Sequence, residues 1–282
     1  VDEDGVVWGS DQEGHWTPAN RINRVTPGSF QGNNWSGSRL GKDPLPDYDR
    51  PLLWMHPSID RSPAAQVRVP KNSWGSLGGK LLGISYGTGE VYLILEDEID
   101  GVHQGAYVPL PIELPTGLMR GRFNPADGDL YVCGLFGWSS NQTEPGGFYR
   151  VRRSEAKLLI PLGVRALSDG LFIYFSDPIT TSEEELLTAF DVEAWNYEWT
   201  KRYGSLQYDI ETGADGTTKL DVEGVVLSPD RRAVWLNIPE MSPAMQMHLK
   251  WRLAFEGYGE RDSFIHMTVH SLHQDSAQTY VD

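Results

Sequence analysis

Two arginines separated by a single residue are the clearest candidates for chemistry in this sequence. Arg120 and Arg122 stand in the run 118–123, where apolar residues flank them. Side chains two positions apart project from the same face of a β-strand, so both guanidinium groups can point into one pocket. Such forked cations suit an anion that carries several carboxylates. The alternative is that both arginines are solvated, or paired with carboxylates of a very acidic protein.

Aromatic side chains form a second group of candidates. A polar stretch near residue 200 holds four of them, and aromatic faces suit carbohydrate rings. The interpretation that we favour for this stretch is an interface between two domains, with a sugar-binding platform as the alternative. The candidates for substrate binding, from this stretch and from the first half of the chain, are His15, Trp16, Trp138, Trp195, Tyr197 and Trp199.

Metal and covalent chemistry find little support in the sequence. His266, His270 and His273 have the spacing of metal ligands, but the residues around them alternate as in a strand. Histidines four apart on a strand are about 13 Å apart, so one ion cannot bridge them and we predict no metal site. The single cysteine, Cys133, lies in a strand-like run and is expected to be inert. No nucleophile motif or phosphate loop occurs, whereas glycoside hydrolysis by paired carboxylates stays open among 39 acidic residues.

Composition narrows the class of protein. The 282 residues carry a net charge of −15, which argues against binding to nucleic acid or to an anionic membrane surface. No stretch is long and apolar enough to span a membrane as a helix. The 30 glycines and 18 prolines are too many for a helical protein and too few for a disordered one, so many short strands are expected.

The elements that would position these candidates are short strands throughout. Up to about residue 153 they form three loosely repeated units of roughly 45 residues, a period typical of propeller blades. Beyond it, alternating strands every 8 to 14 residues indicate an immunoglobulin-like sandwich. One helix is expected at 182–190, with Ser182 as its N-cap. We therefore predict an all-β protein, with about three propeller blades at 1–155 and an Ig-like β-sandwich at 156–282.

Several phrases also carry a resemblance to a known family. The run 8–25 is similar to a phrase of the glucose/sorbosone dehydrogenases, six-bladed propellers that use pyrroloquinoline quinone. The chain resembles still more closely the large secreted propeller proteins of planctomycetes and verrucomicrobia that are called membrane-bound dehydrogenases. Their propeller is followed by an Ig-like domain. Similar phrases recur at 85–89, 117–125, 134–138, 146–152 and 195–199.

The resemblance implies a cofactor site. Gln12 matches a glutamine that contacts the quinone, and Arg120 and Arg122 match an Arg-x-Arg pair that binds its carboxylates. The acidic pair that helps to hold calcium and cofactor in those enzymes is replaced here by Asn20 and Arg21. The implied cofactors, pyrroloquinoline quinone and Ca²⁺, are therefore placed in doubt, and no catalytic residue is identified.

The resulting expectation is part of a secreted, quinone-type sugar or alcohol dehydrogenase-like protein that acts on carbohydrate. The alternative is a non-catalytic carbohydrate-binding or scaffold module. Three blades cannot close a ring, so the missing blades are expected from the same precursor, from a partner chain or from a second copy. The chain opens like a domain cut from a longer protein, and the resemblance suggests an extracellular or periplasmic location.

Overall fold

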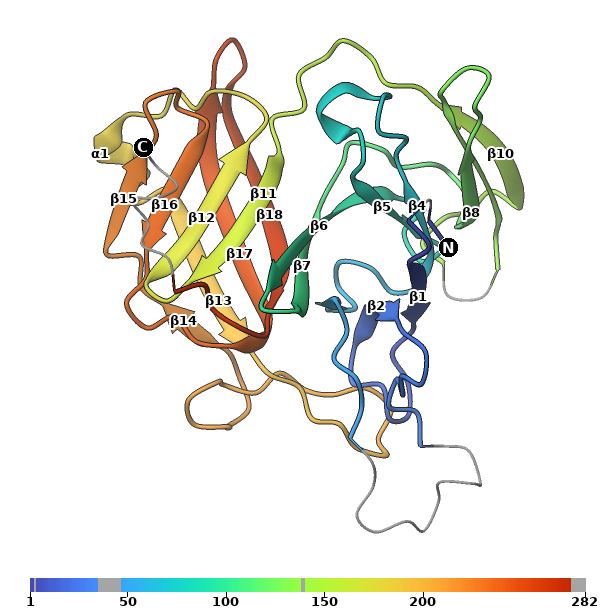
Figure 1. Ribbon diagram of the computed structural model, residues 1–282, viewed down its shortest axis with the longest axis horizontal. Helices are drawn as coiled ribbons and strands as arrows, with labels where there is room; N and C mark the ends of the chain where they lie inside the picture. The colour runs from blue at the N-terminus through green and yellow to red at the C-terminus, as the bar shows by residue number, and fades with distance from the viewer. Residues whose placement is uncertain (3, 35–46, 138–139, 275–282) are drawn as a thin grey trace. The chain divides into compact units, whose positions relative to one another are not determined.

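The computed structural model describes residues 1, 2, 4–34, 47–137 and 140–274. Strands make up most of the ordered structure, and the sheets are antiparallel and open, so the predicted all-β class is confirmed (Figure 1). Two compact units emerge. Unit 1 comprises Val1–Leu93, Leu110–Arg153 and Tyr197–Tyr208, and unit 2 comprises Ile94–Pro109, Ser154–Asn196 and Asp209–Asp282. The expected domain ranges, 1–155 and 156–282, stay a prediction.

Unit 1 is built from three successive antiparallel meanders. Their strands are β1 (Val7–Asp11), β2 (Asn20–Val25) and β3 (Leu53–Met55); β4 (Pro63–Arg68), β5 (Leu81–Ser85) and β6 (Val91–Ile99); and β8 (Leu118–Phe123), β9 (Leu130–Leu135) and β10 (Gly146–Val151). The first strands contact one another in the order β1, β4, β8. Consecutive propeller blades contact one another through their inner strands in this way. The arrangement is consistent with a partial propeller.

Tight turns hold the meanders together. Between β5 and β6, Gly89 has φ +72°, and a Cβ there would lie 2.4 Å from the carbonyl oxygen of Leu114. Only glycine satisfies both the left-handed backbone and the close approach. A 3₁₀ turn, η1 (Gly75–Leu77), lies between β4 and β5.

Strand β6 passes from unit 1 to unit 2 along the chain, because Leu93 belongs to the first and Ile94 to the second.

Unit 2 has two facing sheets, as expected for a sandwich (Figure 1). One has the order β11-β12-β16-β15, and the other runs β14-β13-β17-β18-β7. The rings of Phe175 in β12 and Trp251 in β17 meet edge to face at 5.6 Å, which joins the two sheets. The bounds are β7 (Val102–Val108), β11 (Pro161–Leu167), β12 (Gly170–Phe175), β13 (Phe190–Trp195), β14 (Thr218–Leu220), β15 (Gly224–Leu227), β16 (Ala233–Asn237), β17 (Ala244–Phe255) and β18 (Gly259–Val269).

Alternation of apolar and polar residues explains the sandwich core. In β17, Leu249, Trp251 and Leu253 are buried, whereas the intervening Lys250 and Arg252 are exposed. A strand of this pattern buries one face against a second sheet and leaves the other to solvent. The same alternation predicted a strand rather than a helix around His266, and β18 confirms it.

The expected helix is correct at its start and wrong at its end. Ser182 accepts a hydrogen bond from the Glu185 amide, and the Glu185 side chain accepts one from the Ser182 amide, which completes a capping box. The helix α1 spans only Glu183–Leu186. Residues from Phe190 onward form β13 instead, because their apolar side chains alternate and pair with β17.

Candidate functional site

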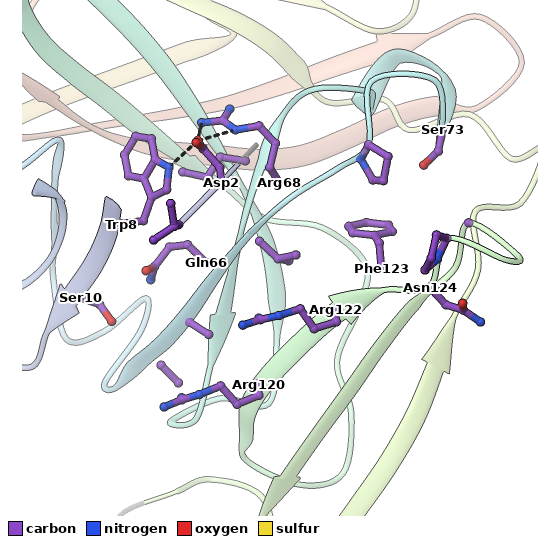
Figure 2. A pocket seen from close by; sticks show the side chains of 18 of the residues that line it. Asp2, Trp8, Ser10, Gln66, Arg68, Ser73, Arg120, Arg122, Phe123 and Asn124 are labelled. Carbon is purple, nitrogen blue, oxygen red and sulfur yellow. Dashed lines mark hydrogen bonds and ion pairs between the residues drawn. The ribbon is translucent and has the colours of Figure 1, made fainter. Parts of the chain in front are cut away.

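A hollow of unit 1 is formed by the first strand of each meander. It has a volume of about 810 Å³ and is lined by residues of β1, β4 and β8 and of the loops beside them. We call it the arginine pocket. Its polar and aromatic lining includes Trp8, Ser10, Gln66, Arg68, Arg120, Arg122, Phe123 and Asn124 (Figure 2).

Arg120 and Arg122 extend from the same face of β8 into this pocket (Figure 2). Both side chains are exposed, and Gly121 between them faces the core. Each guanidinium donates to the carbonyl oxygen of its preceding residue, at 2.6 Å for Arg120 and 2.7 Å for Arg122. Within the described part of the chain, neither forms an ion pair with a carboxylate. Two adjacent positive charges therefore face the pocket without a counter-charge.

The third arginine of the pocket is neutralised. Arg68 donates from Nε and Nη2 to Oδ2 of Asp2, at 3.2 and 3.1 Å, and its guanidinium carbon lies 5.5 Å from the centre of the Trp8 ring. Trp8 donates to the same carboxylate oxygen at 2.9 Å, as the dashed lines in Figure 2 show. The ion pair leaves Arg120 and Arg122 as the charged groups that are available to a ligand.

Asp2 is the buried carboxylate of this ion pair. Its side chain is only 3% exposed, and it is the one acidic residue among the described residues that line the pocket. Burial raises the pKa of Asp2, but hydrogen bonds from Trp8, the Val6 amide and Arg68 outweigh it, so the pKa lies below the ordinary value. Asp2 is therefore ionised at neutral pH, and both of its carboxylate oxygens accept hydrogen bonds. The arrangement can hold an anion, but it offers no free carboxylate as a base.

Aromatic rings complete the walls of the arginine pocket. Phe123 at the end of β8 meets the Trp74 ring edge to face at 5.0 Å, and Trp74 Nε1 donates to the Gly128 carbonyl at 3.0 Å. Those contacts fix Phe123 at one end of the pocket, while Trp8 stands on β1. The pocket therefore combines cations with ring faces and with the neutral polar groups of Gln66 and Asn124.

Gln12 does not line the arginine pocket. It lines a separate hollow of about 220 Å³, together with Glu13, Arg61 and Tyr86 among others. Its Oε1 accepts a hydrogen bond from Ser62 Oγ at 3.4 Å. The three residues that the resemblance assigns to one cofactor are thus divided between two hollows of unit 1.

The residues that replace the expected acidic pair have structural contacts. Asn20 is fully buried, donates to the Asp60 carbonyl and accepts from the Glu13 amide at 2.7 Å. Arg21 is 1% exposed and forms an ion pair with Asp11 at 2.8 Å. Burial lowers the pKa of Arg21, and Asp11 opposes this shift. Neither residue contributes to the lining of the arginine pocket.

The aromatic candidates of unit 1 pack mainly against one another. Trp199 Nε1 donates to the carbonyl oxygens of Trp16 and Gly32, at 3.0 and 2.9 Å, and its ring lies 5.4 Å from that of Trp16. Tyr197 is buried beside Trp54, with ring centres 6.1 Å apart. These three side chains hold the segment Tyr197–Tyr208 within unit 1.

The remaining candidates have different surroundings. His15 is exposed, donates from Nδ1 to the Lys201 carbonyl at 2.9 Å and meets the Tyr203 ring edge to face. Trp195 belongs to β13 of unit 2, where it is 2% exposed and packs against His266. Trp138 lies outside the described residues. The five described candidates are therefore divided between the two units, with Trp195 in unit 2 and the other four in unit 1.

Sequence reasoning missed Trp8, Gln66, Arg68 and Asp2 as pocket residues. Gln66 and Arg68 share the alternation that identified the pair on β8, because they stand two apart on β4. That signal was present and could have been used. The partner of Arg68 could not be found in this way, because Asp2 lies 66 positions away along the chain.

Comparisons with known proteins give no relative for this chain. Searches against models of protein families, against curated proteins and against solved structures each found no match. Among the described residues, no helix has the length and apolar character needed to cross a membrane. Function is therefore argued from the geometry of the two hollows.

Proposed function

We propose that unit 1 is a recognition module for an organic anion that carries two or more carboxylates, bound in the arginine pocket. The observation that carries the proposal is the pair Arg120 and Arg122, which face one pocket without a carboxylate partner among the described residues. Guanidinium groups bind carboxylates through two parallel hydrogen bonds, so two of them suit a ligand with several such groups.

The charge of the protein strengthens this argument. At a net charge of −15, the chain has many carboxylates that could pair with any exposed arginine. Arg68 and Arg150 are paired in this way, at 3.1 Å from Asp2 and 2.5 Å from Asp129. An arginine pair that has no such partner among the described residues and that faces a large hollow is therefore a feature that a ligand explains.

A quinone cofactor fits this pocket in part. Arg120 and Arg122 would bind the carboxylates of pyrroloquinoline quinone, as the resemblance suggests. Gln12 lines another hollow, Asn20 and Arg21 are held by structural contacts, and Asp2 is bound to Arg68. Since Asp2 is the one carboxylate among the described residues that line the pocket and it is paired with Arg68, the pocket supplies neither a free carboxylate for Ca²⁺ nor a free base, and we derive no oxidation step from it.

An acidic saccharide is the second ligand with this chemistry. Trp8 and Phe123 offer ring faces, and Gln66 and Asn124 offer hydrogen-bonding groups suited to hydroxyls. A uronic acid oligomer would place its carboxylates at Arg120 and Arg122. This ligand agrees with the non-catalytic carbohydrate-binding module that the sequence left open, and with an extracellular or periplasmic location.

Calorimetric titration of the purified chain tests the proposal. The ligands are pyrroloquinoline quinone with and without Ca²⁺, an oligogalacturonate, citrate, and the uncharged maltotriose. We expect at least one polycarboxylate to bind and maltotriose not to bind in this pocket. Loss of two charge-assisted contacts costs about 3 kcal/mol, so the variant Arg120→Ala/Arg122→Ala should bind the active ligand about a hundredfold more weakly.

A matched variant separates this site from a general effect of charge. Arg152→Ala/Arg261→Ala removes the same charge at exposed positions that do not line the pocket. It should bind like the unmodified chain. Equal weakening in both double variants, or no heat with any polycarboxylate, would overturn the proposal. Preference for the quinone over citrate and oligogalacturonate would favour a cofactor site, and the reverse would favour glycan recognition.

A further inference from the structure

The smaller hollow of unit 1 contains two opposite charges that do not pair with each other. It is lined by Gln12, Glu13, Pro57, Arg61, Ser62, Tyr86 and Tyr203 and has a volume of about 220 Å³. Glu13 and Arg61 are its ionisable groups besides the two tyrosines. Within the described part of the chain, the Glu13 carboxylate forms neither a hydrogen bond nor an ion pair, although its backbone amide donates to Asn20.

Glu13 is held in place by its surroundings. It is half-buried, and its carboxylate lies over Gly204, where a Cβ would be 2.1 Å from Oε1. Gly204 has φ +65°, so a residue without a side chain is required both by the backbone and by the carboxylate. The carboxylate therefore packs against Gly204, and Glu13 borders both this hollow and a neighbouring one of about 190 Å³ that Gly204 also lines.

A buried polar network fixes the two charged residues relative to each other. Asn20 accepts from the Glu13 amide at 2.7 Å and donates to the carbonyl oxygen of Asp60. The Asp60 carboxylate in turn accepts from the Ser62 amide at 2.8 Å, next to Arg61. Because Asn20 and Asp60 are fully buried, the backbones of Glu13 and Arg61 are tied together through rigid groups.

Arg61 retains donors for a ligand. Its Nη2 donates to Oδ1 of Asn141, and the other guanidinium N–H groups have no hydrogen-bond acceptor within the described part of the chain. Tyr86 and Tyr203 supply aromatic walls, and Tyr203 is 58% exposed. The hollow thus presents one cation, one carboxylate and ring faces in a space suited to a small molecule.

We propose that this hollow binds a small zwitterion, a free α-amino acid, with its carboxylate at Arg61 and its ammonium group at Glu13. A ligand with both charges satisfies both groups at once, whereas a purely anionic or cationic ligand would meet repulsion from one of them. The side chain of the amino acid would lie against Tyr86 and Tyr203. The proposed site is independent of the arginine pocket, so the two proposals can fail separately.

Calorimetric titration with leucine, tyrosine and glycine tests the site. N-acetyl-leucine, which lacks the ammonium group, leucinamide, which lacks the carboxylate, and neutral glucose are the comparison ligands. We expect an amino acid to bind and both derivatives to bind about tenfold more weakly or worse, because each leaves either the half-buried Glu13 or the exposed Arg61 without its ligand partner. The proposal would be overturned if glucose bound as tightly as the amino acids, or if N-acetyl-leucine or leucinamide bound as tightly as leucine.

Variants of each charge provide the second readout. Glu13→Gln and Arg61→Gln each remove one charge and should each weaken amino-acid binding about tenfold, whereas Arg120→Ala/Arg122→Ala should leave it unchanged. Burial raises the pKa of Glu13. Binding to the unmodified chain should therefore weaken as the pH falls through that raised pKa, and binding to Glu13→Gln should not change there. No amino-acid binding by a folded unmodified chain would refute the site.

Discussion

Asp60 offers a quantitative test of the polar network in unit 1. Its side chain is fully buried and accepts hydrogen bonds from Ser85 Oγ at 2.7 Å and from the Ser62 amide at 2.8 Å. Burial raises its pKa from 3.8 to about 7, against the opposing effect of these hydrogen bonds. The folded protein consequently binds a proton at Asp60 at a pH where the unfolded chain has released it.

The sign and size of the effect follow from linkage. Between pH 4 and pH 7 the folded state holds more protons at this site than the unfolded state, so the free energy of unfolding falls as the pH rises through that interval. Above about pH 7 this loss is complete. The difference between a pKa of 3.8 and one of about 7 corresponds to about 4 kcal/mol.

The variant Asp60→Asn isolates this contribution, because the amide does not titrate. Its side-chain oxygen can still accept from Ser85 and Ser62. Hydrogen exchange of peptides that cover β4 and β5, measured at several pH values, reports the opening free energy of this region. Relative to the variant, the unmodified chain should lose about 4 kcal/mol between pH 4 and pH 8. A constant difference between the two proteins over this range would refute the assignment of a buried, protonated Asp60.

Three further outcomes test unit 2. Phe175→Ala should lower the free energy of unfolding of unit 2 by about 4 kcal/mol in urea titrations, because this fully buried ring packs against Trp251 between the sheets. A loss below about 1 kcal/mol would contradict the packing. Burial lowers the pKa of His248, and the hydrogen bond with Glu193 opposes this shift only in part. The contribution of His248 to the free energy of unfolding of unit 2 should therefore fall as the pH drops below 6.5, and His248→Gln should remove that part of the loss. Ser182→Ala should cost about 1 kcal/mol by removing the helix cap, as measured by exchange of the α1 amides.

Local periodicity was enough to predict much of the fold. Alternation correctly predicted the strand around His266, and a capping pattern correctly placed the start of α1 at Ser182. The same reasoning placed Arg120 and Arg122 on one face of a strand. These features are set by residues within a few positions along the chain, because strand alternation and helix capping follow directly from local backbone geometry.

Features that depend on distant residues were not predictable in this way. The contact of Arg68 with Asp2 and that of Ser62 with Gln12 join meanders that are about 50 residues apart or more. The position of Gln12 in a separate hollow follows from how β1 contacts β4, which alternation within either strand does not specify. Similarly, the packing of Trp199 on Trp16 unites segments 183 residues apart.

The central claim is that Arg120 and Arg122 together bind the carboxylates of a ligand, and side-chain NMR tests it most directly. The Nε–Hε signals of Arg120 and Arg122 are assigned from the variants Arg120→Lys and Arg122→Lys, and the unmodified chain is then titrated with the polycarboxylate that binds best. We predict that these two signals shift together, while the signal of Arg68, held by Asp2, shifts much less. Shifts spread over arginines outside the pocket, or no shift at Arg120 and Arg122, would contradict the account.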